Sequence, residues 1–359
     1  MKKLDLYIIK KFLGTFFFMI SLFVVIAVIF DISEKIDDFL EKEAPFSAII
    51  TEYYFSFIPW LYSILSSLLI FLAVILFTSQ MAQRNEIIAI LSSGIRFKRM
   101  LFPYFLSALI LFFISIFLNN WVIPKTNQVK LDFESKYYKT KSYNVRTHQI
   151  HREINPDSYV YIDNFDGKRL KGYKFTLERF ENGKVVEFLR AQQIKWDKEK
   201  QLWTIINYHT RNIENGVETL IKGSRMDTTF NFTPQEISAK VSFIEAMDYS
   251  EITEYIDKEK ARGSQRVKFY EFEHYKRFAI PFAIFPLTLI GLSFASVKKK
   301  RGVGLHLASG ITIGAFYVFF NKVAEVFAVK GGLPADWAVW TPTIIFSIIA
   351  VYSYFKTPK

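Results

Sequence analysis

The chain has 359 residues, of which 51% are hydrophobic and 18% are aromatic, and it carries a formal net charge of +12. The basic residues lie in short clusters beside apolar segments rather than in one stripe on a polar domain, which argues against a nucleic-acid-binding protein. Cysteine is absent, so disulfide bonds, thiolate nucleophiles and Cys-based metal sites are excluded.

Six apolar segments dominate the sequence. Each is roughly 18–25 residues long and free of Asp, Glu, Lys and Arg, which suffices to cross the ~30 Å hydrocarbon core as a helix. The segments are Phe12–Phe30, Phe55–Ser79, Leu101–Ile123, Phe278–Val297, Val303–Phe320 and Trp337–Phe355. The first is longer than the apolar region of a cleavable signal peptide, and no small-residue cleavage site follows it. The sequence therefore predicts a polytopic membrane protein with six transmembrane helices, three on each side of a polar insert.

The charges of the short loops predict the orientation. Basic residues cluster before the first span, between the second and third, between the fourth and fifth, and after the sixth, whereas the loop after the first span is acidic. Basic loops remain on the cytoplasmic side of the membrane. We therefore expect both termini in the cytoplasm and residues 124–276 in the periplasm of a bacterium.

The polar insert changes from helical to two-residue periodicity. Short aromatic and β-branched runs alternate with turn signals, which predicts an antiparallel sandwich, jelly roll or open barrel over residues 124–248. The predicted strands are Tyr159–Ile162, Tyr173–Leu177, Ile194–Trp196, Leu202–Ile206 and Thr228–Phe232. A helical connector is expected over 249–276, with Asp248 as its N-cap and Gly263 as an interruption. Residues 1–123 and 277–359 then form the membrane parts.

The sequence contains no motif for nucleotide hydrolysis or ion coupling. It has no G-x-x-x-x-G-K-[ST] phosphate loop, and its spans lack the mid-membrane charged residues that ion-driven transporters use. His148 and His151 have a spacing that suits metal binding on a helix, but near predicted strands this spacing places them on opposite faces. We expect no metal, no other cofactor and no catalytic residue. Any energy would have to come from an ion gradient or a partner protein, and the lack of mid-membrane charges argues against the ion gradient.

The segment between the second and third spans is the most specific part of the sequence. Residues 84–93 predict a short amphipathic helix. Its residues of interest are Arg84, Glu86, Ile87, Ile90, Leu91 and Gly94. The three aliphatic residues form an apolar stripe, the two charged residues remain in water, and the glycine supplies a left-handed C-cap. The helix is either a simple interfacial connector or a coupling helix that lies in a groove on a cytoplasmic ATPase.

The stretch Ala82–Ile87, followed by Ser93-Gly94, resembles the motif of the lipopolysaccharide-export permeases of the LptF/LptG (YjgP/YjgQ) family. The similarity runs over nearly the whole chain. It includes Leu4–Ile8, Asn120–Pro124, Tyr159–Ile162, the strand with Trp203, Asn231–Pro234, Leu292–Phe294 and Gly310–Gly314. The opening and the A-Q-R-x-E form are most similar to LptG. The loop after the first span is more acidic than the family pattern. The resemblance therefore does not identify which basic residue of this loop meets the substrate.

The resemblance implies a non-catalytic permease subunit in the inner membrane of a Gram-negative bacterium. Such a subunit pairs with a homologous LptF-like permease over two copies of an LptB-like ATPase. The pair extracts lipopolysaccharide from the inner membrane. The periplasmic β-jellyroll then passes it to LptC- and LptA-like jellyroll proteins that lead to the outer membrane.

Two sets of residues are candidates for substrate contact. Lys35, Lys125 and Lys322 lie just beyond the first, third and fifth spans, where they are placed to bind head-group phosphates or simply to snorkel to the interface. The aromatic residues Tyr159, Tyr161, Trp196 and Trp203 suit either an acyl-chain groove in the β-domain or a filled hydrophobic core. An exposed edge strand of this domain would require a partner.

Two other function classes remain open from the sequence. A membrane-anchored periplasmic sensor or enzyme would work without an ATPase and would need a polar cluster within the insert. An efflux permease of a different ATP-driven family would place one span, rather than three, before its extracytoplasmic domain.

Overall fold

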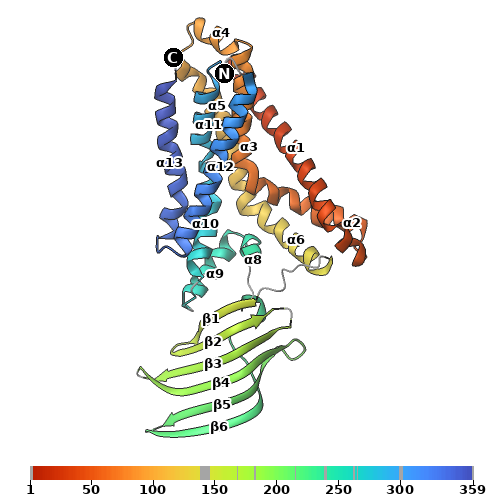
Figure 1. The fold of residues 1–359 in the computed structure, drawn as a ribbon, viewed down its shortest axis with the longest axis vertical. Coiled ribbons are helices and arrows are strands. Elements are labelled where there is room, and N and C mark those ends of the chain that lie inside the picture. Colours follow the sequence, from red (N-terminus) through yellow and green to blue (C-terminus); the bar gives the residue numbers. More distant parts are fainter. Residues whose placement is uncertain are drawn as a thin grey trace. The chain divides into compact units, whose positions relative to one another are not determined.

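The structure is a computed structural model (Figure 1). It describes residues 3–137, 146–167, 169–181, 183–214, 216–237, 241–261, 263–264, 266–298 and 302–357. The chain forms two compact units. The helical unit comprises Met1–Tyr137, Glu245–Ser250 and Lys268–Lys359, and the β unit comprises Tyr138–Ile244 and Glu251–Val267.

The prediction of six transmembrane helices is confirmed, and each helix extends beyond its apolar stretch at one or both ends. The elements are α1 (Lys3–Glu41), α2 (Phe46–Ala48), η1 (Ile49–Tyr54), α3 (Phe55–Gln83), α5 (Phe97–Phe117), η2 (Leu118–Val122), α6 (Ile123–Tyr137), α10 (Val267–Phe282), α11 (Ile284–Ala295), α12 (Gly302–Val329) and α13 (Ala335–Lys356). The π-helices η1 and η2 continue directly into their neighbouring α-helices, so the second and third spans run over Phe46–Gln83 and Phe97–Tyr137. The added length consists of amphipathic turns at the helix ends. These turns contain polar residues and therefore lie outside the apolar segments identified in the sequence.

The two ends of the helical unit differ in what they carry. The start of α1, the end of α13 and the short helix α4 (Glu86–Ser92) lie at one end, and α6 and the start of α10 lie at the other (Figure 1). This arrangement agrees with the expectation that both termini are on the same side as the loop between the second and third spans.

Aromatic rings of three helices pack in the core of the helical unit. Phe77 of α3 stacks on Phe12 of α1 at 5.4 Å between ring centroids and on Tyr104 of α5 at 5.1 Å. The Tyr104 hydroxyl forms a 2.9 Å hydrogen bond with Thr78, which satisfies two buried polar groups. Helix α3 therefore fixes both α1 and α5.

A glycine permits the close packing of α11 against α3. A methyl group added at Gly291 would lie 2.9 Å from Cγ1 of Val74 and 3.2 Å from its Cβ. Val74 is fully buried and its β-branched side chain is stiff in a helix, so relief requires a shift of the backbone.

We expect Gly291→Val to lower the thermal unfolding midpoint of the detergent-solubilised protein by several degrees, because overpacking costs about 1–3 kcal/mol. Gly14→Val is the matched control, since Gly14 also lies in a helix but has no atom within 4 Å of its added Cβ. Equal melting of the two variants would contradict this account of the contact.

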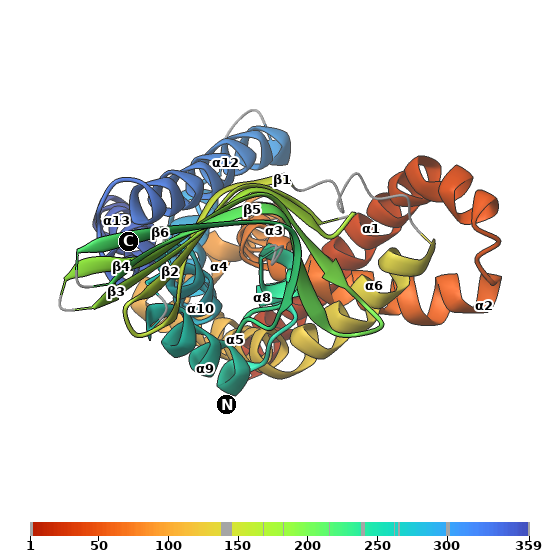
Figure 2. The same cartoon turned by 90° about the horizontal axis from the view of Figure 1, so that it is seen from below.

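The β unit contains one antiparallel sheet of six strands in sequential order, which confirms the predicted β-domain between the third and fourth spans (Figure 1). Figure 2 shows from below that the strands are strongly curved. The strands are β1 (Arg146–Asn155), β2 (Ser158–Asp166), β3 (Lys171–Glu181), β4 (Lys184–Asp197), β5 (Leu202–Glu214) and β6 (Val217–Thr228). The core strands β2–β5 contain the predicted runs. The edge strands β1 and β6 are largely polar, so the sequence pattern did not reveal them. The side chain of His148 in β1 lies outside the described residues.

A transverse row of irregular positions crosses the sheet. Regular pairing is interrupted between Asp163 and Lys174, between Lys174 and Gln192, and between Gln192 and Asn207. Lys174 and Asn207 both have a φ of 51°. The alternation of inward-facing residues shifts by one position at this row, while the pairing register is the same on both sides of it. The buried residues are Val160, Ile162, Phe175, Leu189 and Ala191 on one side of the row and Phe165, Ile194, Trp203 and Ile205 on the other.

The prediction of a strand over Thr228–Phe232 is wrong. Strand β6 ends at Thr228, and residues 229–233 are irregular. The rings of Phe230 and Phe232 stack at 5.3 Å and 7°, and the Phe232 carbonyl accepts a 3.0 Å hydrogen bond from Trp203 Nε1. The segment thus covers the hydrophobic core instead of joining the sheet, whose edge on β5 is already occupied by β6.

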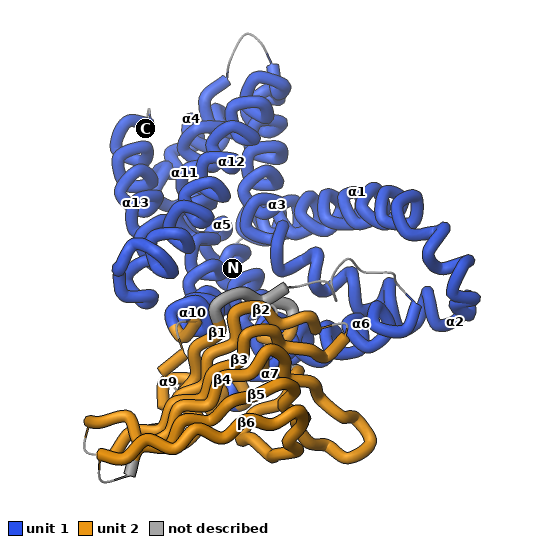
Figure 3. Tube along the Cα trace, turned by 60° about the horizontal axis from the view of Figure 1, so that its bottom comes forward, with its two compact units in different colours: residues 1–137, 245–250, 268–359 blue, residues 138–244, 251–267 orange. Residues whose placement is uncertain are grey.

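Short helices connect the sheet to the fourth span. They are α7 (Pro234–Ile237), α8 (Val241–Glu245) and α9 (Tyr249–Ala261). The Asp248 carboxylate accepts a 2.8 Å hydrogen bond from the Ser250 amide, as predicted for an N-cap. Gly263, with a φ of +62°, separates α9 from α10, which confirms the predicted interruption. Figure 3 shows that residues 245–250 belong to the helical unit although their neighbours belong to the β unit.

Candidate functional site

The helix α4 is a short, sharply bounded element at the end of the helical unit that carries both chain termini. Asn85 precedes it with a φ of +59°, and Gly94 ends it with a φ of +81°. The Gly94 amide donates a 3.0 Å hydrogen bond to the Leu91 carbonyl, which agrees with the predicted left-handed C-cap. The helix starts at residue 86 rather than 84, because the left-handed turn at Asn85 separates it from α3.

The apolar stripe of α4 faces the bundle to which the helix belongs. Ile87 is 2% exposed, and Ile90 and Leu91 pack against the core that α1, α3 and α5 form. The opposite face presents Ile88, which is 52% exposed, and the exposed Ala89. A partner that binds α4 therefore meets this second face.

The carboxylate of Glu86 connects α4 to α1. It accepts a 2.6 Å hydrogen bond from the Tyr7 hydroxyl and lies 3.2 Å from Lys11 Nζ. Tyr7 and Lys11 are four residues apart, so they share a face of α1. Arg84, which sequence analysis grouped with Glu86, is exposed. The sequence did not identify Tyr7 and Lys11 as partners, because they precede Glu86 by more than seventy residues.

Two further contacts lie beside α4. Lys298, after α11, donates a 2.9 Å hydrogen bond to the Asn85 side chain. Arg99 of α5 forms a 2.7 Å ion pair with Asp5 of α1, and Asp5 is only 2% exposed. These contacts and the Glu86 contacts tie α4 and the helices around it together, and we call them the α4 frame.

The three lysines predicted just beyond the spans, which we call the rim lysines, differ in their surroundings. Lys35 lies 2.6 Å from Asp31 and also hydrogen-bonds the Tyr53 hydroxyl, so its charge is largely compensated within α1 and η1. Lys322 is exposed but lies 2.8 Å from Glu325. Lys125 is exposed, and no polar partner for it occurs among the described residues. The three lie on different helices, α1, α6 and α12.

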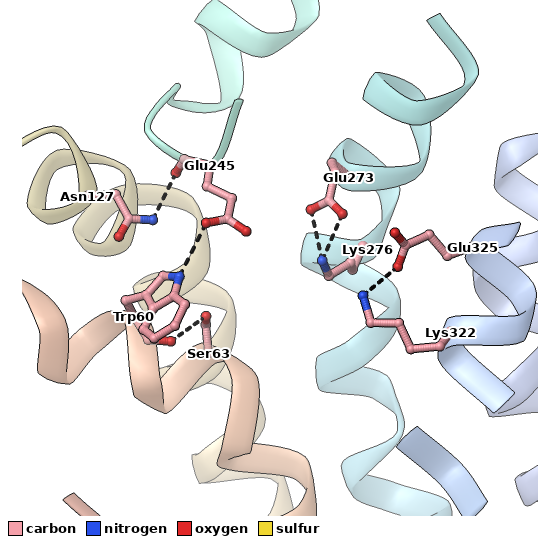
Figure 4. Close-up of polar contacts among 8 residues, drawn as sticks. All are labelled: Trp60, Ser63, Asn127, Glu245, Glu273, Lys276, Lys322 and Glu325. Atoms are coloured by element: carbon pink, nitrogen blue, oxygen red, sulfur yellow. Dashed lines mark hydrogen bonds and ion pairs between the residues drawn. The ribbon is translucent and has the colours of Figure 1, made fainter. Parts of the chain in front are cut away.

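A polar cluster that sequence analysis missed joins Trp60 of α3 and Asn127 of α6 to Glu245 (Figure 4). Trp60 Nε1 donates a 3.2 Å hydrogen bond to Glu245, and the Glu245 carbonyl accepts a 3.5 Å bond from Asn127. Lys130 Nζ lies 3.8 Å from the centroid of the Trp60 ring, a cation–π contact. Thus α3 and α6 together hold the chain at the point where it returns from the β unit.

Neighbouring ion pairs extend this cluster towards α10 and α12. Lys276 contacts both carboxylate oxygens of Glu273 at 2.9 and 2.8 Å, and Figure 4 shows the Lys322–Glu325 pair beside Lys276. Glu273, Lys276 and Glu325 lie outside the apolar segments in polar stretches, so the sequence indicated them only weakly.

Burial in this cluster makes the ionisation of Glu245 unfavourable. Burial first, and then the negative charge of Glu273, raise the pKa of Glu245 above its ordinary value of 4.5. The folded protein therefore holds this proton more tightly than the unfolded chain does. It loses stability as the pH rises from the ordinary towards the raised pKa.

We expect Glu245→Gln, which keeps an acceptor for Trp60, to raise the thermal midpoint relative to the parent at about pH 8 and to leave it unchanged at about pH 4.5. Paired melting curves of both proteins across this range in detergent measure the difference. Exposed Glu251→Gln is the control and should show no such trend. A difference that shrinks as the pH rises would contradict the assignment.

The four predicted aromatic residues of the β unit divide into two pairs. Trp196 and Trp203 pair across β4 and β5 with ring centroids 5.1 Å apart, and both belong to the apolar cluster. Tyr159 and Tyr161 alternate along β2 with the core residue Val160, so they face the other side of the sheet. Trp203 is fully buried, which makes it part of the filled core.

Comparison with known proteins decides between the function classes. The chain matches the family described as lipopolysaccharide export system permease LptF/LptG over residues 6–356. The chain belongs to this family. It is 21% identical over 285 residues to the lipopolysaccharide export system permease protein LptG of Escherichia coli K12, with 78% of each chain covered. It is 20% identical over 282 residues to the LptG protein of Haemophilus influenzae, with 77% of each covered.

Membership in the LptF/LptG family makes the chain a multi-pass inner-membrane protein and a permease component for lipopolysaccharide export. The expected family resemblance is thereby confirmed. It also identifies the β unit as part of a transport protein rather than of a sensor.

Proposed function

We propose that the chain is the LptG-like subunit of an ATP-driven transporter that extracts lipopolysaccharide from the inner membrane and passes it to a periplasmic bridge. The observation that carries the proposal is α4: a short helix between two spans, fixed by its frame and exposing Ile88 and Ala89. The sequence has no phosphate-binding loop, so ATP hydrolysis belongs to a separate subunit. An LptB-like ATPase dimer would receive the exposed face of α4 in a groove, on the cytoplasmic side with both termini.

The substrate contacts follow from exposure and charge. Among the rim lysines, Lys125 is the best candidate for a head-group phosphate, because it is exposed and has no polar partner among the described residues. Lys322 would have to leave Glu325, and Lys35 would have to leave Asp31. For the acyl chains, the apolar face beside Trp196 is the candidate, with Phe230 and Phe232 as the segment that would move aside.

The unpaired edge of the sheet suggests where a second β-domain attaches. Strand β6 has no neighbour beyond β5 among the described strands, and it exposes Val217, Leu220 and Ile221 by 67, 58 and 48%. Exposed apolar edge strands are completed by partners in many complexes. We assign this edge to an LptC- or LptA-like jellyroll protein, and an LptF-like permease to the helical unit.

Site-specific crosslinking in native membranes tests these assignments together, because the chain contains no cysteine of its own. Purification of the tagged chain should recover an ATPase and a second permease. A cysteine at Ile88 should crosslink to the ATPase, one at Leu220 to a periplasmic β-domain, and a photo-reactive residue at position 125 to lipopolysaccharide. A cysteine at the exposed apolar residue Ile311 is the control. Absence of an ATPase from the purified complex and from the Ile88 crosslinks would overturn the proposed function.

A further inference from the structure

We propose that the β unit carries a saccharide-binding pocket on the face of its sheet opposite the apolar core. The inference deepens the proposed function and rests on it, since lipopolysaccharide carries a sugar chain that the apolar face cannot bind. The pocket has a volume of about 700 Å³, which falls in the ~300–1,000 Å³ range of small-ligand sites. It is formed by β1–β4 together with Gly263 after α9.

Strand alternation separates this pocket from the core. Tyr159 and Tyr161 of β2 line the pocket, whereas Ile162 beside them is buried in the apolar cluster. Thr176 of β3 and Arg190 of β4 extend the pocket along the same face. Val160 of the apolar cluster also borders the pocket, but most of the lining side chains lie on the face opposite the core, so acyl chains and sugars have largely separate faces available.

Aromatic rings in the pocket suit the flat face of a sugar. The rings of Tyr161 and His151 lie 4.6 Å apart at 43°, and Tyr159 is 42% exposed with its ring held edge-on against Phe180 at 5.7 Å. Phe188 also lines the pocket. Aromatic rings of this kind offer apolar area and, in tyrosine and histidine, a polar end. A pyranose ring presents the matching combination of C–H groups on its face and hydroxyl groups on its rim.

The polar groups of the pocket are balanced in charge. Lys174 lies 2.9 Å from Asp163, and the Tyr161 hydroxyl donates a 3.0 Å hydrogen bond to the same carboxylate. The remaining charged groups include both acceptors and donors. They are Arg152, Glu153, Glu178 and Arg190.

This balance selects a class of ligand. Outside the Asp163–Lys174 pair, the two carboxylates of Glu153 and Glu178 outnumber the guanidinium of Arg190 and disfavour a phosphate. The charged groups also disfavour an acyl chain, whereas hydroxyl groups require donors and acceptors side by side. Arg152 does not add a net charge, because it forms a buried 2.9 Å ion pair with Glu259. The pocket therefore fits an oligosaccharide rather than a phosphate or a lipid tail.

Saturation-transfer NMR on the full-length protein in detergent micelles tests the pocket, with lipid-free core oligosaccharide released from lipopolysaccharide as the probe. We expect sugar ring protons to receive saturation from the parent protein. Tyr159→Ala and Arg190→Ala should each weaken binding about tenfold. Arg179→Ala on the neighbouring strand is the control, since Arg179 is exposed but does not line the pocket.

A pocket-filling variant guards against loss of fold in the truncations. Thr176→Trp should abolish binding, whereas Thr219→Trp on the exposed strand β6 should leave it intact. No binding to the parent, equal binding to all variants, or displacement of the sugar by inorganic phosphate would overturn the proposal. The assay needs no ATPase, so failure of the crosslinks to the ATPase would count against the proposed function and not against the pocket.

Discussion

Replacing Glu86 with lysine is expected to abolish lipopolysaccharide export while the chain remains inserted and folded. The substitution removes the contacts with Tyr7 and Lys11 and places a second ammonium group next to Lys11, whose Nζ lies 3.2 Å from the carboxylate in the parent. Like charges at this distance repel, so the coupling between α4 and α1 is lost. Lipopolysaccharide released per ATP hydrolysed, measured in proteoliposomes with the ATPase, should fall more than tenfold, while basal ATP hydrolysis continues.

The charge-swapped double variant Glu86→Lys with Lys11→Glu separates two roles of this residue. If Glu86 acts through α1 alone, the swap restores the ion pair and most of the export. If Glu86 also contacts the ATPase, the swap leaves export low. Normal export by the single variant, with a complex of normal composition, would contradict a role of Glu86 in coupling.

Truncation of Trp203 to alanine is expected to unfold the β unit more readily than any other single truncation there. Trp203 is fully buried, packs against Phe165 and Phe232, and donates its indole hydrogen to the Phe232 carbonyl. Loss of a buried tryptophan typically costs about 3–5 kcal/mol, and an orphaned carbonyl adds to this cost. Proteolysis of the β unit at increasing urea concentration should detect the change as a lower midpoint.

Two neighbouring variants calibrate this result. Trp203→Phe keeps an aromatic ring but loses the indole hydrogen bond, so its midpoint should lie between those of the parent and of Trp203→Ala. Trp196→Ala removes a half-buried ring and should also be milder. A Trp203→Ala midpoint equal to that of the parent would show that the residue lies in an open groove rather than in a filled core.

The membrane helices were predictable because their signal is local. A run of apolar residues long enough to cross the bilayer needs no knowledge of its neighbours, and all six runs proved helical. The ends were not predictable in the same way. The third span continues to Tyr137 through turns whose polar faces contact other helices, and the sequence does not display those contacts.

The sheet illustrates the limit of periodicity more clearly. The two-residue pattern identified the apolar strands β2–β5, but β6 exposes most of its side chains and has no buried face to read. The interrupted row at Asp163, Lys174 and Asn207 shifts the alternation within single strands. Two residues of the same strand, in β2 or β4 for example, can then lie on opposite faces of the sheet although an even spacing would place them on one face.

For the candidate site, the types of residue could be predicted from the sequence, but their contacts with residues of other helices could not. The apolar stripe of α4 and its glycine C-cap followed from the sequence, yet the stripe packs on its own bundle. Glu86 was recognised as important, but its partners lie on α1, and Lys35 is compensated by Asp31 and Tyr53. Such pairings depend on which helices meet, which a single sequence does not state.

The length of α1 has a mechanical consequence. It runs as one unbroken α-helix from Lys3 to Glu41, without the proline and π-helical segments that interrupt the second and third spans. Lys11, which contacts Glu86, and Lys35, which contacts Asp31 and Tyr53, are 24 positions apart along it, or about 36 Å. A continuous helix with contacts near both ends has no proline or π-helical segment at which it would bend. Movement of α4 would therefore displace the contacts of Lys35, and α1 would transmit the movement from one surface of the membrane to the other.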